Sequence, residues 1–446
     1  RLLVIVAADT SREPRFQVSS EPDRSAQVVG VQVHGLQPGG AVVITDTVFG
    51  YPLGSLADLP PGDYRVQALL NRYETYHLGQ GTTVELPPDR GEGQQWSRKP
   101  GNLYSVPTTV HLGPGEGTTV TLSLDHVVSE VAPPEDTPWI RHVRVRSDLL
   151  TEFWGRPTFL QGTVLLPAGF DEHPEARYPL VVWHGHFGRG IPGWRTEPPD
   201  STLPAPDTTW LYAHCATGRE DGCPEHGMAR LRQELAWGFF RWWSGPDAPR
   251  MLLMTVQHAN PYYDDSYAVN SANVGPYGDA ITRELIPEVE GRLGGIGEGW
   301  ARTLMGGSTG GWEALGAQVF YPDDYNGAWA FCPDPVDFHA YQAVDVYGDV
   351  NAYRRAGPFG MVEVPGARDH LGRVRYQMAD ENHMELVLGT RGRSGGQWDI
   401  WQAVFGPRGD DGYPAPIWDK VTGRIDPEVA AYWREHYDLT HILERD

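Results

Sequence analysis

One serine in the second half of the chain lies in a pattern suited to nucleophilic chemistry. Residues 306–310 read Gly-Gly-Ser-Thr-Gly, which fits G-x-S-x-G with Ser308 at its centre. Small residues two positions either side permit a tight turn in which a strand and a helix nearly touch. Residues 300–305 are short and mostly apolar, as in a buried strand, and apolar residues recur at helical spacing after the serine. The pattern predicts that Ser308 sits on an exposed strand-to-helix elbow.

A second match to the pattern centres on Ser394. Residues 392–396 read Gly-Arg-Ser-Gly-Gly, in a chain whose 53 glycines will produce such matches by chance. The preceding residues 389–393 are rich in Gly and Arg, which is typical of a loop rather than of a buried strand. The context therefore favours Ser308 as the elbow.

A serine nucleophile needs a base and a pocket that stabilises an oxyanion. Residues 180–185 read Leu-Val-Val-Trp-His-Gly, a predicted strand that ends about 120 residues before Ser308. The loop after this strand is expected to supply one backbone N–H, from Gly185 or His186, and Thr309 the second. The alternative interpretation is that His-Gly simply forms a turn at the strand end.

Residues from about 158 onward resemble an esterase group of the α/β-hydrolases that includes enterochelin esterase-like and feruloyl esterase-like enzymes. The resemblance covers roughly two thirds of the chain and is carried by residues 163–167 (Thr-Val-Leu-Leu-Pro), 178–185, 306–311, 321–327 (Tyr-Pro-Asp-Asp-Tyr-Asn-Gly) and 331–335. It implies an α/β-hydrolase fold, a small-molecule ester as substrate and an acyl-enzyme on Ser308. It implies no cofactor.

The catalytic acid and histidine are not evident. In this fold they usually follow the two strands after the one predicted at 327–332, and no convincing further pair of central strands follows Cys332. One interpretation is that the sequence ends before these groups. The other is that Asp334 or Asp337, just after the strand, is the acid, and His370 or His383 the base, although both histidines lie in charged segments typical of a surface.

Residues 257–267, Gln-His-Ala-Asn-Pro-Tyr-Tyr-Asp-Asp-Ser-Tyr, follow a predicted central strand, where ligand sites of α/β proteins form. Asp264 and Asp265 could attract a cation, but their spacing favours no metal, and none is predicted. A surface loop with turn-forming Asn and Pro is the alternative. The predicted substrate-binding side chains are those of His184, Tyr262, Tyr263 and Tyr267.

The chain divides into two predicted domains. Short strand-like runs separated by Gly and Pro turns fill residues 1–135, and they predict an N-terminal, Ig-like β-sandwich followed by a Pro-rich linker at 132–138. The runs lie at residues 2–7, 28–34, 41–45, 64–70, 82–86 and 118–124.

From residue 136 to 446 strands alternate with helices, which predicts an α/β domain with a mostly parallel central sheet. A helix is expected from Asp279, which Pro287 should kink or break, and another over 429–443. The expected strands lie at residues 159–167, 178–184, 251–257, 300–305 and 327–332.

The composition excludes several classes of protein. The 446 residues carry a net charge of −22, which disfavours nucleic acid and anionic membranes as partners. No apolar run approaches the ~20 residues of a membrane span. The oligomeric state is not predicted.

Cysteine usage bears on the compartment. Cys215 and Cys223 flank a short polar segment and are expected to form a disulfide, to remain free thiols, or to bind zinc together with His214 and His226. Cys332 is expected in the core. The start at Arg1 without Met suggests a trimmed product, and with the possible disulfide it favours an extracytoplasmic or secreted protein.

The leading hypothesis is a serine-dependent carboxylic ester hydrolase. A serine peptidase of oligopeptidase-like type could use the same elbow behind a β domain. A non-catalytic binding protein that keeps the hydrolase fold is the alternative from another class.

Overall fold

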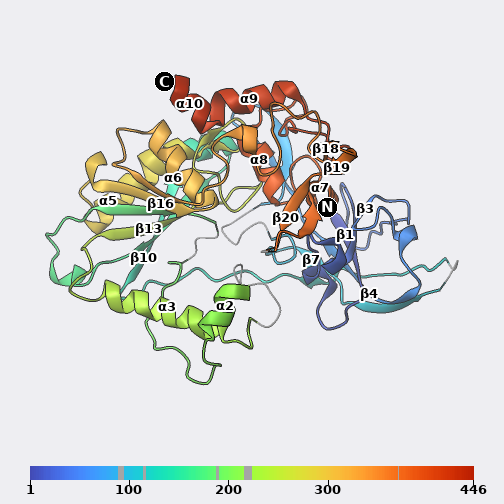
Figure 1. Ribbon diagram of the computed structural model, residues 1–446, viewed down its shortest axis with the longest axis horizontal. Coiled ribbons are helices and arrows are strands. Elements are labelled where there is room, and N and C mark those ends of the chain that lie inside the picture. Colours follow the sequence, from blue (N-terminus) through green and yellow to red (C-terminus); the bar gives the residue numbers. More distant parts are fainter. Residues whose placement is uncertain (89–94, 114–116, 187–189, 215–222, 370, 446) are drawn as a thin grey trace.

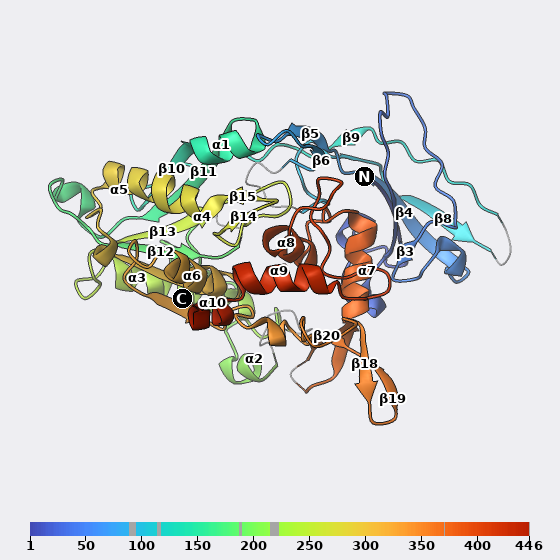
Figure 2. The same cartoon turned by 90° about the horizontal axis from the view of Figure 1, so that it is seen from above.

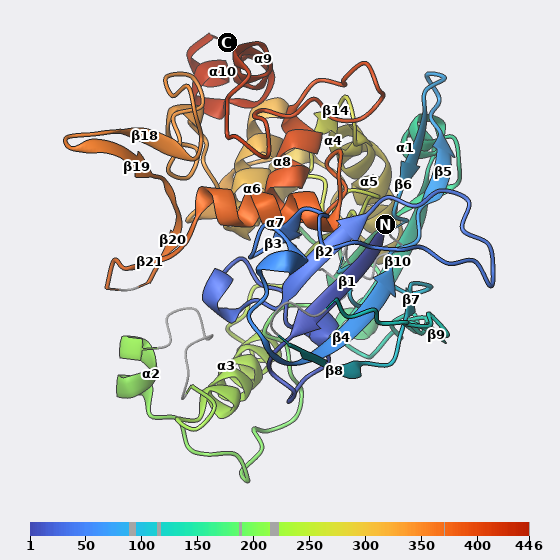
Figure 3. The ribbon, with the colours of Figure 1, turned by 90° about the vertical axis from the view of Figure 1, so that its right-hand side faces the viewer.

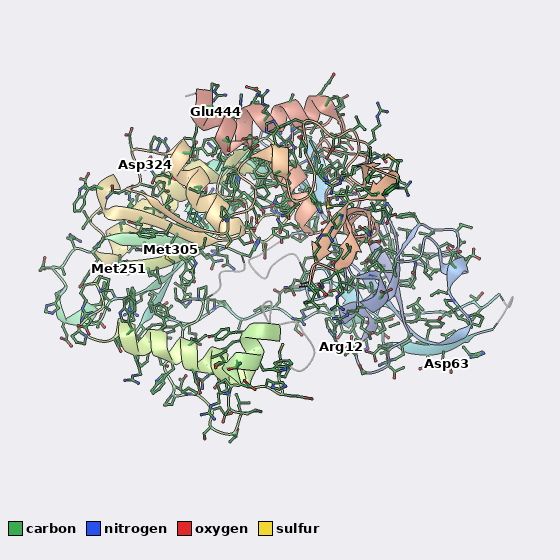
Figure 4. The ribbon with its side chains drawn as sticks, viewed as in Figure 1. Arg12, Asp63, Met251, Met305, Asp324 and Glu444 are labelled. Atoms are coloured by element: carbon green, nitrogen blue, oxygen red, sulfur yellow. The ribbon has the colours of Figure 1, made fainter. Side chains whose placement is uncertain are left out.

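The computed structural model describes residues 1–88, 95–113, 117–186, 190–214, 223–369 and 371–445, with the side chains of 213 and 214 excepted. Two large sheets lie at opposite ends of the molecule, with helix α7 between them (Figures 1 and 2). In Figure 4, Arg12 and Asp63 mark the N-terminal end, whereas Met251, Met305 and Asp324 mark the other.

The sheet that carries Ser308 has six strands in the order β10-β11-β13-β12-β16-β17. Strands β13, β12, β16 and β17 run parallel, and β10 and β11 are antiparallel additions at one edge. A mixed α/β fold with a mostly parallel sheet is therefore present, as the sequence predicts. The strands span Ile140–Ser147 (β10), Thr158–Leu165 (β11), Leu180–His184 (β12), Leu252–Gln257 (β13), Arg302–Gly307 (β16) and Ala328–Phe331 (β17).

Helices cover both faces of this sheet, because alternate side chains of each strand point to opposite faces. Trp183 and Leu253 pack with Trp243 of α3 on one face. Val182 and Met254 belong to the core on the other face, together with residues of α4, α5 and α6. Figure 1 shows α5 and α6 on the opposite side of the sheet from α3. The helices span Asp148–Trp154 (α1), Thr208–His214 (α2), Met228–Trp243 (α3), Tyr277–Ala280 (α4), Ile286–Leu293 (α5) and Thr309–Phe320 (α6).

The helix predicted around Pro287 is interrupted. A π-helical turn over Ile281–Leu285 separates α4 from α5. Pro287 lies in the first turn of α5 and has no N–H to donate to the preceding turn, so the wider turn accommodates it.

After β17 the described chain adds helices and hairpins but no further strand of this sheet. The helix expected over 429–443 is split at Asp438 into α9 and α10. The remaining helices span Met378–Leu388 (α7), Gln397–Phe405 (α8), Pro427–Tyr437 (α9) and Leu439–Arg445 (α10). The two hairpins after β17 pair Arg354–Gly357 with Gly360–Glu363 (β18, β19) and Pro365–Arg368 with Val374–Gln377 (β20, β21), and an earlier hairpin, after β13, pairs Asn270–Ser271 with Gly275–Pro276 (β14, β15).

The N-terminal sheet is antiparallel and has seven strands. Helix α7 lies beside β2 and β3 (Figure 3), and its Val387 and Leu388 pack with Leu3 and Leu69. Because a helix from the C-terminal part covers this face, a β-sandwich is not confirmed. The strands span Leu2–Ala7 (β1), Gln27–Val31 (β2), Gly50–Tyr51 (β3), Gly62–Leu70 (β4), Leu103–Tyr104 (β7), Thr108–Leu112 (β8) and His126–Val127 (β9).

Two predicted strands of this region are wrong: residues 41–45 and 118–124 have no strand structure. The run predicted at residues 82–86 forms a separate hairpin, in which β6 (Thr83–Leu86) pairs with β5 (Glu74–His77). Its Tyr76 and Leu86 belong to the core of the six-stranded sheet. None of the described helices has the length and apolar character that a bilayer span requires.

Candidate active site

Ser308 lies on a strand-to-helix elbow between β16 and α6. Its backbone has φ 55° and ψ −125°, a conformation that residues other than glycine adopt only at a cost of about 1–3 kcal/mol. The flanking glycines are sterically required. A Cβ on Gly306 would lie 2.1 Å from the carbonyl oxygen of Gly310, and a Cβ on Gly310 would lie 2.2 Å from that of His184. The elbow predicted from the sequence is therefore present.

Ser394 is not on an elbow. Its buried side chain accepts a hydrogen bond of 3.0 Å from Gly396 N, just before helix α8. Its own N–H donates to Asp399 Oδ2 at 3.0 Å. These two hydrogen bonds hold the backbone at the start of α8 in place.

Three hydroxyl groups converge on Asp334, which follows β17. Ser308 Oγ donates to Asp334 Oδ1 at 3.3 Å, and Thr309 Oγ1 donates to Oδ2 at 2.9 Å. Tyr267 OH also donates to Oδ2, at 2.8 Å. The same Tyr267 oxygen accepts from Gln397 Nε2 at 2.7 Å and from Trp401 Nε1, so α8 holds it in place.

The other candidates for acid and base lie elsewhere. Asp337 accepts hydrogen bonds from His339 and caps the short helix that follows. His383 lies on α7 with its ring against Phe49 and Tyr353. His370 is outside the described residues. Within the described chain, the hydrogen-bond acceptor of the Ser308 hydroxyl is therefore the carboxylate of Asp334 and not an imidazole.

The predicted oxyanion donors lie at the edge of the sheet that carries Ser308. Thr309 is the first residue of α6, so its N–H has no partner within the helix. Strand β12 runs parallel to β16 with His184 opposite Gly306. Gly185 and His186 therefore follow β12 at the same edge at which Ser308 follows β16.

A buried polar cluster lies beneath the elbow. His184 Nδ1 and His258 Nε2 are each 3.6 Å from a carboxylate oxygen of Glu313, and these side chains are at most 1% exposed. Burial lowers the pKa of His184 to about 3 and that of His258 to about 4. Burial also raises the pKa of Glu313 well above its usual value. Burial thus disfavours the charged form of each of the three groups.

This burial corrects part of the predicted substrate surface. His184, Tyr262 and Tyr267 are all buried. His184 contacts Glu313, and Tyr267 donates a hydrogen bond to Asp334. These buried side chains therefore hold other residues of the site in position and do not form a substrate surface. Tyr263 is only partly buried, and its ring packs edge-on against that of His186 at 5.6 Å.

His186 contacts two carboxylates through its side chain. Its Nδ1 lies against Asp265 Oδ2 and 3.7 Å from Asp264 Oδ1. Burial lowers the pKa of His186, but the two carboxylates outweigh this effect and raise it to about 11. Burial raises the pKa of Asp264 to about 6, whereas His186 outweighs burial at Asp265 and lowers its pKa.

Sequence reasoning missed Glu313, Gln397 and Trp401. Glu313 gives a signal, since it is the one charged residue in helix α6. Gln397 and Trp401 give none, because α8 reaches the site only through the tertiary fold.

Of the expectations for the cysteines, a disulfide is present at Cys223, whereas zinc binding by Cys223 and burial of Cys332 are not. Cys223 takes part in a disulfide, which excludes it as a zinc ligand; Cys215 is outside the described residues. His226 stacks on Trp210 at 3.8 Å. Cys332 is exposed, not in the core, because β17 is an edge strand.

No family model and no curated protein matches the chain. Solved structures similar to it include a ferulic acid esterase, with 20% identity, a TM-score of 0.28, and coverage of 44% of this chain and 60% of that one. An IroE-like serine hydrolase from Shewanella oneidensis has 19% identity, a TM-score of 0.25, and coverage of 44% and 51%. A ferulic acid esterase from Anaeromyces mucronatus has 17% identity, a TM-score of 0.26, and coverage of 46% and 63%.

These neighbours are esterases and serine hydrolases. The comparison thus returns the esterase group that the sequence motifs indicate. The matched region spans less than two thirds of each of these three chains. At such identities and TM-scores the likeness carries no argument about function, which rests on the geometry of the site.

Proposed function

We propose that the chain is a serine hydrolase that cleaves carboxylic esters of small molecules through an acyl-enzyme on Ser308. The observation that carries the proposal is the backbone of Ser308, held at φ 55° and ψ −125° between β16 and α6. This conformation presents the hydroxyl at the edge where β12, β16 and β17 end. Residues 136–446 would form the hydrolase part, and residues 1–135 a supporting part.

In the first half of the reaction, Ser308 Oγ bonds to the acyl carbon and its proton passes to a base. The carbonyl oxygen becomes an oxyanion, which the backbone N–H groups of Thr309 and of Gly185 or His186 can stabilise. Collapse expels the alcohol, which takes up a proton. Water then attacks the acyl-serine and releases the acid. Asp334, which accepts the hydrogen bond of the serine, holds the hydroxyl in place.

A fluorophosphonate probe tests the proposal, because it labels only an activated serine. Intact mass and peptide mapping should show one adduct, on Ser308, that Ser308→Ala removes. Ser394→Ala is the matched control, since Ser394 lies in the second G-x-S-x-G match, and it should label like the wild type. Cleavage of p-nitrophenyl acyl esters but not of peptide p-nitroanilides would separate an esterase from a peptidase.

One observation favours a second candidate, a non-catalytic binding protein. The described chain offers the Ser308 hydroxyl a carboxylate but no imidazole. Complete inertness of Ser308 to the probe would support this candidate and refute the esterase.

We also propose an extracytoplasmic location. The disulfide at Cys223 supports it, because disulfides persist in oxidising compartments. The same intact-mass measurement checks it: protein from its native source that gains two hydrogens on reduction would agree, and an unchanged mass would not.

A further inference from the structure

A second group of polar side chains lies at the same edge of the sheet, and the hydrolytic mechanism does not use it. His186 follows β12, and Asp264 and Asp265 lie in the segment after β13. The ligating atoms of the three side chains all lie within 4.8 Å of one another. His186 Nδ1 is 3.7 Å from Asp264 Oδ1 and directly contacts Asp265 Oδ2.

The two carboxylates are buried without adequate compensation. The Asp264 side chain is 3% exposed and that of Asp265 is fully buried. In the described part of the chain, the His186 ring is the one side chain placed to balance either charge: it lies 3.7 Å from Asp264 Oδ1 and contacts Asp265 Oδ2, and Asp265 Oδ1 accepts besides only from the backbone N–H of Tyr267 at 3.2 Å. Among the described residues, no Arg or Lys forms an ion pair with either carboxylate. Buried negative charge is costly unless a cation pairs with it, and one imidazole cannot balance two carboxylates.

The donor set indicates which cation fits. One imidazole nitrogen and two carboxylate oxygens suit Zn²⁺, whose bonds of about 2.0–2.2 Å place neighbouring ligands about 3.4 Å apart in a tetrahedron. The 3.7 Å between His186 Nδ1 and Asp264 Oδ1 is close to that separation. Ca²⁺ and Mg²⁺ prefer sites built from oxygen ligands.

A second His/Asp cluster provides the contrast. Asp337, His339 and Asp438 also bring three ligating atoms within 4.8 Å of one another. There Asp438 Oδ2 accepts from Phe338 N at 2.9 Å and from Tyr347 OH at 2.7 Å, and Asp337 Oδ1 accepts from His339 N at 2.9 Å. These carboxylates already have hydrogen-bond donors, so this cluster serves as the control.

We propose that His186, Asp264 and Asp265 bind one Zn²⁺ ion. Three protein ligands leave a fourth position for water or a substrate oxygen. The ion fastens the segment after β13 to the loop after β12. That segment carries Tyr267, whose hydroxyl donates to Asp334, so the ion also fixes one side of the Ser308 site.

The test is titration calorimetry with Zn²⁺ on metal-free protein that carries no histidine tag. The wild type is expected to bind one equivalent. Asp264→Asn and Asp265→Asn should each weaken binding by about 100-fold or more, since loss of an outer hydrogen-bond partner alone costs 10–100-fold. Asp337→Asn, in the control cluster, should bind zinc like the wild type.

Absence of zinc binding by the wild type, or undiminished affinity in both Asn variants, would overturn the proposal. X-ray absorption of the zinc-loaded wild type decides the question even if the variants fail to fold. One imidazole with oxygen ligands supports the site. A shell that contains sulfur, as exposed Cys332 would supply, or more than one imidazole refutes it.

Discussion

Alanine at Gly306 and alanine at Gly307 should have opposite consequences, although the two residues are neighbours in β16. A Cβ on Gly306 would lie 2.1 Å from the carbonyl oxygen of Gly310, about 1.3 Å short of the 3.4 Å at which ordinary contact begins. The atoms that the added Cβ would meet belong to the backbone of Gly310, so the backbone of the elbow itself must move. Overpacking of this kind costs about 1–3 kcal/mol, and a shift of about 1 Å at a reacting group can lower the rate about 100-fold.

At Gly307 the nearest atoms to an added Cβ are Phe331 O at 3.6 Å and Phe331 Cβ at 3.9 Å, which are ordinary contacts. Gly307→Ala should therefore change the free energy of unfolding by less than about 1 kcal/mol, because a compatible alanine mainly restricts the unfolded chain.

Urea unfolding and the rate of fluorophosphonate labelling would be measured for both variants. Gly306→Ala is expected to lose about 2 kcal/mol or more of unfolding free energy and most of the labelling rate. Equal effects, or a larger loss for Gly307→Ala, would refute the elbow geometry.

Two further predictions concern the groups around the elbow. Tyr267→Phe removes the hydroxyl between Asp334 and Gln397 and leaves buried donors unpaired, so the free energy of unfolding should fall by about 1–3 kcal/mol and labelling of Ser308 should slow; a variant unchanged in both urea unfolding and labelling would contradict this. Burial lowers the pKa of His258 from 6.5 to about 4, so its contribution to stability is complete above pH 6.5 and is lost as the pH falls from 6.5 toward 4. Between pH 7.5 and pH 5 the expected loss of unfolding free energy from this group is about 2 kcal/mol. In urea unfolding, the free energy of unfolding of His258→Gln should therefore fall by about 2 kcal/mol less than that of the wild type over this range. An identical fall in both proteins would show that His258 is not buried as described.

The elbow could be predicted from the sequence because its determinants are local. Glycines at 306 and 310 are required by contacts within one turn and one neighbouring strand, and an apolar strand and helix flank them. The strands of the parallel sheet were predictable for a similar reason. Their continuous apolar runs reflect burial on both faces.

Two N-terminal strands were wrong because a run of apolar or alternating residues does not ensure burial. In residues 41–45, Val43 is 86% exposed, and no neighbouring strand provides a surface for it. Where a strand-like sequence has no neighbouring strand, its backbone N–H and C=O groups form hydrogen bonds with water. The sequence alone does not reveal that the neighbouring strand is missing.

The surroundings of Ser308 were only partly predictable. Asp334 stood among the candidates because it directly follows a strand. The buried cluster of His184, His258 and Glu313 joins three segments far apart in the chain, and nothing local reveals that they meet. The contact of Tyr267 with α8 is likewise set by the tertiary fold.

Helix α7 and the β5–β6 hairpin each pack into the core of the sheet that belongs to the other part of the chain. Val387 of α7 completes the core of the N-terminal sheet, and the guanidinium of Arg1 donates to its carbonyl oxygen at 3.0 Å. In return, Tyr76 of the hairpin lies in the core of the other sheet. Each sheet therefore takes part of its core from a segment on the other side of the linker, and we expect the two sheets to unfold together. If the chain were cut at the linker, each half would lose part of its core. Neither half is therefore expected to fold as an independent domain that could be moved into another protein.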